Sequence, residues 1–428
     1  MAPAGRSIRR GLAICADYWR LHRAQRQDPE RLRRVQDAKL REVVDHAWGT
    51  VPFYRERLQA AGIRPGDVRS VADLAGLPPT TKAELQAAGV EARTSSAYRS
   101  DELDTGLTSG STGQPFPFAR DPQAMRLRKA LFLRALGATG YRPGQRMLLL
   151  DAPRENLPPA WLRWHYVRPT VPVEDQLRAV QELRPAILYA SRPTTLGLLA
   201  RFAQAAGVPL HRPRALITTG ETLGASLRGF LQASFAAPVF DVYGAVETGT
   251  IAWECRAHRG LHVADDTVLL ELLPSQHGDV RRIVLTSLEN RGMPLIRYDI
   301  GDLGEPLDEA PCPCGSRFGR IGHVEGRLVD CLRLPDGRLV PPNRLEHAVR
   351  RIEGIERFQV VQERPDAVLV RLQGRGDAPA TEAAERAVAG LVGEEVRVRA
   401  RWEASLDPPP GQKFRLVERR PAAGPAPF

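Results

Sequence analysis

Four short apolar runs between residues 146 and 244 constrain the fold of this chain more than any other feature. They read RMLLLDAP (146–153), AILYAS (186–191), RALITTGE (214–221) and PVFDVYG (238–244). Helical stretches such as TTLGLLARFAQAAG and LGASLRGFLQASF lie between them. Because strands that alternate with helices pair in parallel, this order predicts an α/β core built on a parallel sheet.

The regions on either side of this core have different patterns. Residues 1–100 are rich in Arg, Ala and Leu, with apolar positions at helical spacing, and predict a helical N-terminal part. After about residue 260, runs such as TVLLELL and RRIVLTSL predict a β-rich segment. A small α+β module follows, with a hairpin turn at Pro335, Asp336 and Gly337. We therefore predict a large domain at 1–326 and a small one at 327–428.

Composition excludes several classes of protein. The chain is 43% hydrophobic and 26% charged, as in soluble globular proteins, and no apolar run approaches the ~20 residues that cross a bilayer. The start lacks a secretory signal, so we predict a cytoplasmic protein without membrane insertion. The net charge is +11, but the arginines are scattered rather than forming one stripe with aromatic residues. We therefore predict no nucleic-acid partner.

The cysteines point to a metal site rather than to disulfides. Their number is five, which is odd and suits a reducing compartment. Cys255 and His258 form a C-x₂-H pair, and Cys312 and Cys314 form a C-x-C pair 57 residues further on. These are the ligands that tetrahedral zinc prefers, so the pattern predicts a closed, structural zinc site. His262 is the substitute if His258 faces away, and two unrelated pairs of reduced thiols are the alternative.

Residues 105–118 read TGLTSGSTGQPFPF and are rich in glycine and hydroxyl side chains. Such a stretch cannot hold a helix, because Gly and Pro are poor helix formers and Ser and Thr compete for backbone hydrogen bonds. It can form a loop whose N–H groups point at an anion, or it can be a surface linker. It is not a kinase-type phosphate loop, because no lysine follows the last glycine.

Five further stretches follow this loop in a fixed order. They are ITTGETL (217–223), VYGAVETG (242–249), RYDIGD (297–302), VEGRLVD (324–330) and PPPGQKFRLV (408–417). Together with LTSGSTGQP they resemble the core motifs of the adenylate-forming superfamily of acyl-CoA synthetases and adenylation domains. VPFYRERLQAAGI, LPPTTKAEL and ECRAHRGLHV resemble the phenylacetate–CoA ligase type and its capsular-polysaccharide-associated relatives in particular.

This resemblance implies a large adenylate-forming domain with mixed and parallel sheets, followed by a small mobile α+β lid domain. It implies an acid–thiol ligase that forms an acyl- or aryl-adenylate from ATP and a carboxylic acid, releases pyrophosphate, and then makes a thioester with coenzyme A. Mg²⁺ is the implied metal ion of the reaction, because phosphoryl transfer concentrates negative charge. A homodimer fits the family.

The resemblance also assigns residues to roles, with Thr108, Glu247 and Lys413 as the catalytic set. The phosphates would be held by Thr108, Ser109, Gly110, Ser111, Thr112 and Gly113. The rest of the nucleotide and the acid would be contacted by Gly220, Glu221, Tyr243, Gly244, Thr248, Asp302, Arg327 and Lys413. Within that set, Asp302 would bind the ribose hydroxyls, and Lys413 would lie between the acyl carboxylate and the α-phosphate. Glu247 would hold Mg²⁺, an ion that prefers oxygen ligands.

Two positions depart from the family pattern. Gln114 stands in the phosphate loop where many members carry a lysine, so one cation near the γ-phosphate is missing. The hinge position two residues after Arg327 is usually Asp or Lys, and here it is Val329, with Asp330 one place later. Val329 leaves open whether the lid swings and whether the thiol half-reaction follows.

The sequence leaves the acid and the acceptor unnamed. The acceptor is coenzyme A or, in a second interpretation, a carrier-protein pantetheine, an amine or a sugar; a non-catalytic scaffold with the same fold is a third. An aromatic acid could be faced by Trp161, Trp164, His165 and Tyr166, or these side chains could simply pack between layers. Arg192 could pair with a second carboxylate or a hydroxyl of the acid.

Overall fold

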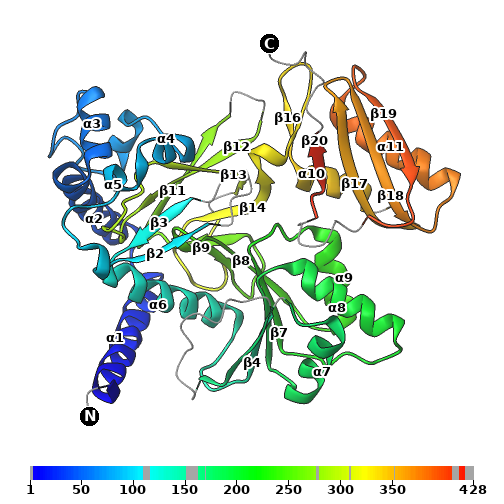
Figure 1. The fold of residues 1–428 in the computed structure, drawn as a ribbon, viewed down its shortest axis with the longest axis horizontal. Coiled ribbons are helices and arrows are strands. Elements are labelled where there is room, and N and C mark those ends of the chain that lie inside the picture. The colour runs from blue at the N-terminus through cyan, green and yellow to red at the C-terminus, as the bar shows by residue number, and fades with distance from the viewer. Residues whose placement is uncertain are drawn as a thin grey trace.

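A computed structural model describes residues 3–108, 116–150, 162–168, 170–275, 279–307, 310–350, 352–406 and 414–419. Figure 1 shows a large α/β unit and a smaller unit formed by the C-terminal part of the chain. The α-helices are α1 (Pro3–Ala24), α2 (Pro29–Thr50), α3 (Pro52–Ala60), α4 (Lys82–Ala87), α5 (Gly89–Arg93), α6 (Pro122–Thr139), α7 (Val173–Leu183), α8 (Pro193–Ala205), α9 (Ala225–Phe235), α10 (Pro342–Val349) and α11 (Ala378–Val392). Short 3₁₀ helices are η1 (Val71–Gly76), η2 (Ser100–Glu102) and η4 (Leu328–Asp330).

The strands form one large sheet, one four-stranded sheet and two hairpins. The large sheet contains β1 (Thr80–Thr81), β4 (Met147–Leu150), β5 (Trp164–Val167), β6 (Ile187–Ala190), β7 (Ala215–Thr219), β8 (Val239–Ala245), β9 (Gly249–Glu254), β10 (Leu261–Val263), β11 (Val268–Pro274), β12 (Arg281–Ser287), β13 (Tyr298–Pro306) and β14 (Arg320–Arg327). The other strands are β2 (Asp104–Leu107), β3 (Pro117–Arg120), β15 (Leu332–Arg333), β16 (Leu339–Val340), β17 (Ile355–Arg364), β18 (Ala367–Gly374), β19 (Arg397–Trp402) and β20 (Val417–Arg419).

The predicted parallel core is confirmed, since β5, β4, β6, β7 and β8 lie side by side in parallel. Their side chains alternate between two buried faces, as a sheet covered on both sides requires. Leu149 and Tyr189 pack on one face with residues of α6, whereas Leu148 and Leu188 pack on the other with residues of α7, α8 and α9. The apolar runs are therefore continuous rather than alternating.

The pairing changes at β8, which is parallel to β7 but antiparallel to β9. The sheet then continues through β10, β14, β13, β12 and β11 in antiparallel pairs. This is the mixed α/β fold that the sequence predicts. Several strands were not predicted, among them β5 at the edge of the parallel core and β1, where Thr80 and Thr81 pair in parallel with Tyr298 and Asp299 of β13.

The N-terminal helices share a core with the far end of the sheet. Tyr54 and other apolar residues between 40 and 77 pack with Leu269, Leu288 and Ile296. The backbone N–H of Ile296 donates to the Tyr54 hydroxyl at 2.9 Å, and Arg297 donates to the backbone oxygens of Ala75 and Leu77. The N-terminal helical part is thereby joined to β13.

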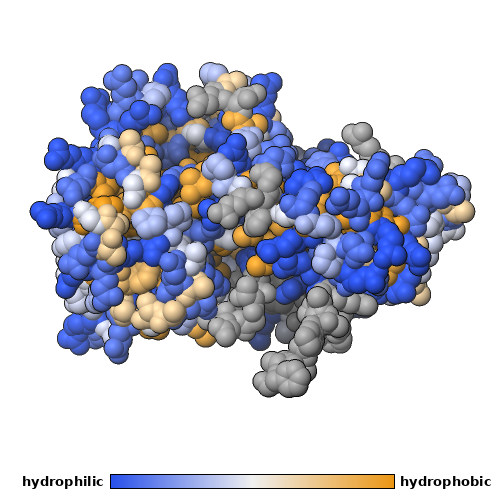
Figure 2. All heavy atoms as spheres, turned by 90° about the horizontal axis from the view of Figure 1, so that it is seen from above, coloured by the Kyte–Doolittle hydropathy of each residue, from blue (hydrophilic) through white to orange (hydrophobic). Residues whose placement is uncertain are grey.

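A separate apolar core forms after β14. It contains Leu332, Leu345 and Val360, and it is enclosed by β15–β18, α10 and α11. The contact between the two units is more polar: Arg344 of α10 pairs with Asp279 at 2.8 Å and with Glu325 at 3.1 Å. Figure 2 shows hydrophilic side chains over much of the visible face of both units.

Within the described ranges, none of the helices combines the length and the apolar character that crossing a bilayer requires.

Candidate functional site

The glycine- and hydroxyl-rich loop connects the two strands of a β-hairpin. β2 and β3 are antiparallel, and the last strand pair is Leu107 with Pro117. At the base of the loop the Thr108 N–H donates to the Phe116 oxygen at 2.9 Å, and the Phe116 N–H donates to Thr108 Oγ1 at 3.2 Å. Both ends of the loop are thus fixed. Five of the predicted phosphate-binding residues lie outside the described residues: Ser109, Gly110, Ser111, Thr112 and Gly113.

Three predicted nucleotide-binding residues meet near the carboxyl end of β8. The Tyr243 hydroxyl donates to Asp302 Oδ2 at 2.7 Å, and Arg327 Nε lies 3.5 Å from Asp302 Oδ1. Asp302 and Arg327 are direct partners in the β13–β14 ladder. Tyr243 and Asp302 are buried, whereas the Arg327 side chain is 47% exposed. The Asp302 carboxylate can accept hydrogen bonds from the ribose hydroxyls of a nucleotide, and the exposed Arg327 beside it can contact the negatively charged phosphate edge.

The charge state of Asp302 reflects this setting. Burial raises the pKa of the Asp302 carboxyl to about 6, and the nearby carboxylate of Glu247 adds to the increase. Arg327 and the Tyr243 hydroxyl oppose the increase in pKa, because both stabilise the ionised form. Asp302 therefore changes its charge within one to two pH units of neutrality.

Glu247 lies in the turn between β8 and β9 and is buried. The Tyr298 hydroxyl donates to Glu247 Oε1 at 3.2 Å, and Tyr298 is the residue that pairs with Thr80 of β1. Arg120 donates to the Val246 oxygen in the same turn and to Asp104 Oδ2 at 2.9 Å. The turn is thus fixed by Arg120 of β3 and Tyr298 of β13, and it presents a carboxylate, the ligand type that Mg²⁺ prefers.

At two further predicted positions, a glycine allows another segment of the backbone to lie very close. Gly220 has φ +75, and a Cβ there would lie 2.6 Å from the Ser191 oxygen. A Cβ at Gly244 would lie 2.5 Å from the Gly249 oxygen. Next to Gly220, Glu221 accepts from Thr194 Oγ1 at 2.9 Å. Thr248 follows Glu247 in the turn; it is partly exposed, and its hydroxyl lies 3.5 Å from the Gly249 oxygen.

The sequence prediction missed Lys82, the first residue of α4. Its Nζ lies 3.5 Å from Thr108 Oγ1 and 5.6 Å from the centroid of the Phe116 ring. Burial lowers the pKa of Lys82, while the charge of Glu247 raises it and that of Arg327 lowers it. Lys82 therefore lies among the predicted phosphate and magnesium residues. The available signal was the scarcity of lysine, which occurs only four times in 428 residues. Lys413, the predicted catalytic lysine, lies outside the described residues.

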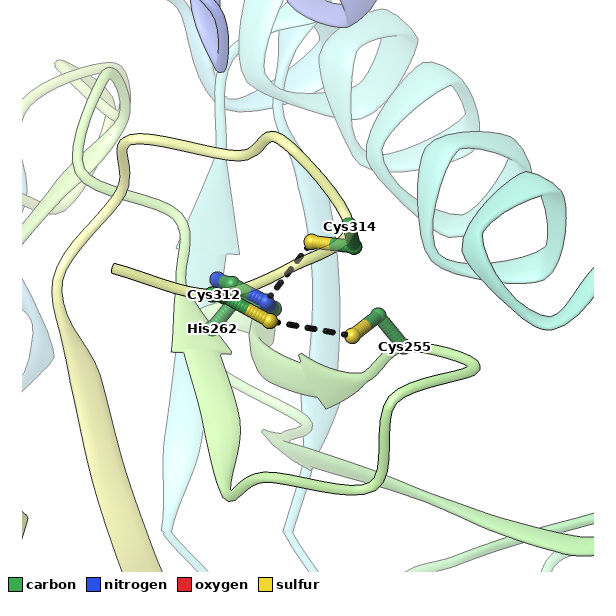
Figure 3. A group of neighbouring side chains, drawn as sticks. All are labelled: Cys255, His262, Cys312 and Cys314. Atoms are coloured by element: carbon green, nitrogen blue, oxygen red, sulfur yellow. Dashed lines mark hydrogen bonds between the residues drawn. The ribbon is translucent and has the colours of Figure 1, made fainter. Parts of the chain in front are cut away.

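The predicted metal ligands converge, with one exchange. Cys255, His262, Cys312 and Cys314 form a Cys/His cluster whose ligand atoms all lie within 4.8 Å of one another (Figure 3). Cys255 Sγ is 3.6 Å from Cys312 Sγ, and Cys314 Sγ is 3.3 Å from His262 Nε2. Neighbouring ligand atoms around tetrahedral zinc are about 3.5–3.8 Å apart, given metal–ligand bonds of 2.0–2.3 Å. The donor set and its spacing fit this ion.

The choice of His258 as the fourth ligand is corrected to His262. Cys255 to His258 form a tight turn, in which His258 has φ +48 and its N–H donates to the Cys255 oxygen at 3.0 Å. The His258 ring stacks on Phe240 with centroids 4.6 Å apart, away from the sulfurs. His262 lies opposite Trp253 in the β9–β10 ladder, on the same face as Cys255. Side chains alternate along a strand, and this brings His262 to the cluster.

Two of the aromatic side chains that could face an aromatic acid are packed against other parts of the protein. Trp164 packs edge-to-face on Phe132 at 5.8 Å and donates from Nε1 to the Tyr141 hydroxyl at 2.8 Å. Tyr166 is partly buried at the margin of the same core. Both therefore pack between α6 and the sheet. His165 is partly exposed on β5, and Trp161 lies outside the described residues.

Comparison with solved structures defines the class of protein. A 2-hydroxyisobutyryl-CoA ligase in its postadenylation state matches with a TM-score of 0.78 at 21% identity, covering 93% of this chain and 91% of that one. The chain thus has the fold of the adenylate-forming ligases. The phenylacetate-coenzyme A ligase of Thermus thermophilus is 30% identical over 363 residues, covering 78% of this chain and 79% of the relative. The chain belongs to the phenylacetate–CoA ligase family.

A second relative supports this assignment. The phenylacetate-coenzyme A ligase of Aromatoleum evansii is 26% identical over 341 residues, covering 74% of this chain and 75% of the relative. No protein-family model matches the chain.

Proposed function

We propose that this protein activates a carboxylic acid with ATP, releases pyrophosphate, and passes the acyl group to coenzyme A. The observation that carries the proposal is the convergence of Tyr243, Glu247, Asp302 and Arg327 near the carboxyl end of β8, in a chain of this family. β8 is the last of the parallel strands, and α/β folds commonly bind ligands outside the carboxyl ends of such strands.

The nucleoside would bind at the Tyr243–Asp302–Arg327 group. An ionised Asp302 accepts hydrogen bonds from both ribose hydroxyls, and the Tyr243 hydroxyl holds the carboxylate in position from behind. Arg327 lies within 3.5 Å of Asp302 and is exposed enough to contact the ribose–phosphate edge. Gly220 and Gly244 would let neighbouring backbone segments pack closely around the nucleotide site, since a side chain at either position would clash with a backbone oxygen.

The phosphates would lie between the β2–β3 loop, Glu247 and Lys82. In the reaction an oxygen of the acid attacks the α-phosphorus, and the bond from that phosphorus to the bridging oxygen of pyrophosphate breaks. Negative charge grows on the phosphoryl oxygens, so fixed donors and cations lower the barrier. Thr108 and Lys82 supply a hydroxyl and a cation within 3.5 Å of each other, and Glu247 would hold Mg²⁺. Lys82 would thus supply the cation that Gln114 does not. Lys413 would neutralise charge between the acid and the α-phosphate.

We also propose that the Cys/His cluster holds a structural zinc ion. Its four ligands fill a tetrahedral shell, so no position is left for a substrate. The ion would join the β9–β10 hairpin to the loop before β14, and β14 carries Arg327. Its proposed effect is to stabilise this part of the sheet.

The second half-reaction would require the small unit, 327–428, to move. Several contacts between the units are ion pairs and hydrogen bonds, such as Arg344 with Glu325 and the Ser226 N–H with Glu346 Oε1 at 3.2 Å. Such contacts exchange for water at little cost. Val329 lies in η4 between the units and is exposed. The next residue, Asp330, lies close enough to Arg327 and Arg415 for their charges to act on its carboxyl group. The chain thus still carries a carboxylate at the hinge, one residue after the usual position.

The acceptor has an alternative, since the same adenylate could pass to a carrier-protein pantetheine, an amine or a sugar. A non-catalytic scaffold is disfavoured because separate segments bring Thr108, Glu247, Asp302 and Arg327 to one place. A homodimer stays a prediction that light scattering would test.

The experiment is acid-dependent exchange of labelled pyrophosphate into ATP, run over aryl, arylacetic and aliphatic acids. Phenylacetate is tested first because the relatives carry that name. We expect exchange that needs an acid and is lost in Lys413→Ala. Thioester formation is then followed with coenzyme A and with a carrier protein. Absence of both exchange and ATP binding would overturn the proposal.

A further inference from the structure

Arg128 extends from the exposed side of α6 above the buried residues Leu127 and Leu131. It lies one helical turn before Phe132, so the two side chains leave the helix on the same side. Phe132 contacts the rings of Tyr189 at 5.4 Å and Trp164 at 5.8 Å, both edge-to-face. Arg128 is thus a cation at the margin of an aromatic layer.

The same side chain lies against the turn that carries Glu247. A Cβ on Gly249 would lie 3.2 Å from Arg128 Cγ, so the stem of the arginine covers this glycine. Arg128 and Glu247 line one small cavity of about 30 Å³, together with Arg120 and Thr250. Arg128 therefore borders the predicted site of adenylation on the side of the aromatic layer.

Two carboxylates, Glu247 and Glu289, line the same cavity as Arg128, but among the described residues they interact with Tyr298 and Lys39 instead. Within the described ranges Arg128 makes neither a hydrogen bond nor an ion pair, whereas Arg120 is held by Asp104 and the Val246 oxygen. The charge of Arg128 also acts on Arg120, whose pKa falls to about 10 through burial and this second cation. Two neighbouring guanidinium groups repel each other, so an anion between Arg128 and the site would be favoured. Arg192, the candidate from the sequence, has an interaction of its own.

The surroundings of Arg128 differ from those of the predicted phosphate loop. The charges that act on Lys82, beside the phosphate loop, are those of Glu247 and Arg327. Arg128 instead acts on Arg120 and on Tyr189, a residue of the aromatic layer on β6. A guanidinium group binds a carboxylate through two parallel hydrogen bonds, which suits a planar carboxylate on a substrate.

We propose that the substrate is a dicarboxylic acid with an aromatic or apolar body, whose second carboxylate binds Arg128. This inference rests on the proposed function, because it assumes that one carboxylate is adenylated beside Glu247. The body of the acid would pack on the partly exposed rings of Phe132 and Trp164, at the margin of the core that they share with Tyr189. Arg128 is then a specificity-determining residue.

The test is pyrophosphate exchange with matched pairs of acids, each pair sharing a skeleton and differing by one carboxylate. Suitable pairs are phenylacetate with 4-carboxyphenylacetate, benzoate with terephthalate, and hexanoate with adipate. For the wild type we expect kcat/KM to favour the dicarboxylate in at least one pair. In Arg128→Leu the kcat/KM for the dicarboxylate should fall by between about tenfold and a hundredfold, which corresponds to the loss of one charged hydrogen-bonded contact. The monocarboxylate and the KM for ATP should change by less than about twofold.

Lys129→Leu is the matched control, because Lys129 is the adjacent exposed cation on α6. This substitution should leave unchanged the ratio of kcat/KM between the dicarboxylate and the monocarboxylate of each pair. Equal loss for both acids in Arg128→Leu, or a raised KM for ATP, would overturn the assignment of Arg128. Exchange with monocarboxylates alone would also overturn it while leaving the proposed function intact. Absence of exchange with every acid would overturn the proposed function first, and this inference with it.

Discussion

The Cys/His cluster takes its four side chains from two short segments, 255–262 and 312–314, and points their ligand atoms at one another within 4.8 Å. The predicted nucleotide site draws on positions from Lys82 to Arg327, spread over α4, the β2–β3 hairpin, β8, β13 and β14. The cluster is closed. The predicted nucleotide site is open: Arg327 is half exposed, and the carboxyl groups of Asp302 and Glu247 lie close to each other.

This difference implies that stability and activity can be changed separately. A closed set of ligands contributes to folding when it binds its ion. A site that holds like charges close together and leaves cations exposed is arranged to bind a ligand. Removing one of these groups should therefore change the free energy of unfolding only slightly. The predictions below use this contrast, from the largest expected effect to the smallest.

Cys312→Ser should break the cluster. We expect loss of bound zinc, measured by mass spectrometry of the metal, and a fall of about 4 kcal/mol in the free energy of unfolding. His262→Ala should act in the same way. His258→Ala is the matched control, because His258 stacks on Phe240 instead of facing the sulfurs, and it should keep the zinc. Zinc retained in His262→Ala but lost in His258→Ala would reverse the correction made above.

Glu247→Gln should lower activity while leaving zinc content and stability unchanged. The substitution keeps the shape of the side chain and its contact with Tyr298 but removes the charge that would hold Mg²⁺. We expect pyrophosphate exchange to fall by at least about 100-fold, as when a group that stabilises transition-state charge is removed. The zinc content should stay at the wild-type value, and the melting temperature within about 2 °C of it. A normal exchange rate would remove Glu247 from the proposed catalytic set.

Lys82→Ala should lower exchange by about ten- to thirtyfold, because it removes a cation next to Thr108. Most of the loss should appear as a raised KM for ATP rather than for the acid. Lys82→Arg should recover part of it by restoring the charge. Equal effects of Lys82→Ala and of Lys129→Ala, an exposed lysine on α6, would mean that Lys82 acts only through net charge.

The pH dependence of ATP binding should reveal Asp302. Its pKa of about 6 means that the carboxylate needed for ribose binding is lost as the pH falls from 7 to 5, so the KM for ATP should rise about tenfold. In Asp302→Asn this dependence should disappear. The raised pKa also means that this group favours folding most below its unfolded value of about 3.9, and that the contribution is lost as the pH rises through 6. A pH-independent KM in the wild type would contradict the assignment.

The sequence predicted the parallel core because its apolar runs are buried on both faces and are separated by helices. It predicted the motif residues through their resemblance to the core motifs of the family, which are short runs of neighbouring residues such as VYGAVETG, where Tyr243 and Glu247 lie on either side of the end of β8. These are local features, and they can be recognised in a single sequence.

Other features depend on pairing between distant segments and could not be predicted in this way. Lys82 reaches the nucleotide site only because Thr80 and Thr81 join β13, more than 200 residues later. The choice between His258 and His262 depends on the β9–β10 register, which the spacing of the residues does not reveal. Arg128 is one exposed arginine among many until Gly249 is seen beneath it.

The shared core of the N-terminal helices and the sheet also affects how the chain folds during synthesis. Residues 40–77 leave the ribosome roughly 190 residues before Leu269, Leu288 and Ile296, so at typical elongation rates they wait about 10–40 s for these partners. Through that interval Leu40, Val43 and other apolar side chains of α2 have no completed core to enter. The first helices to be made are therefore among the last to reach their final packing, and the nascent chain presents a surface that chaperones can bind.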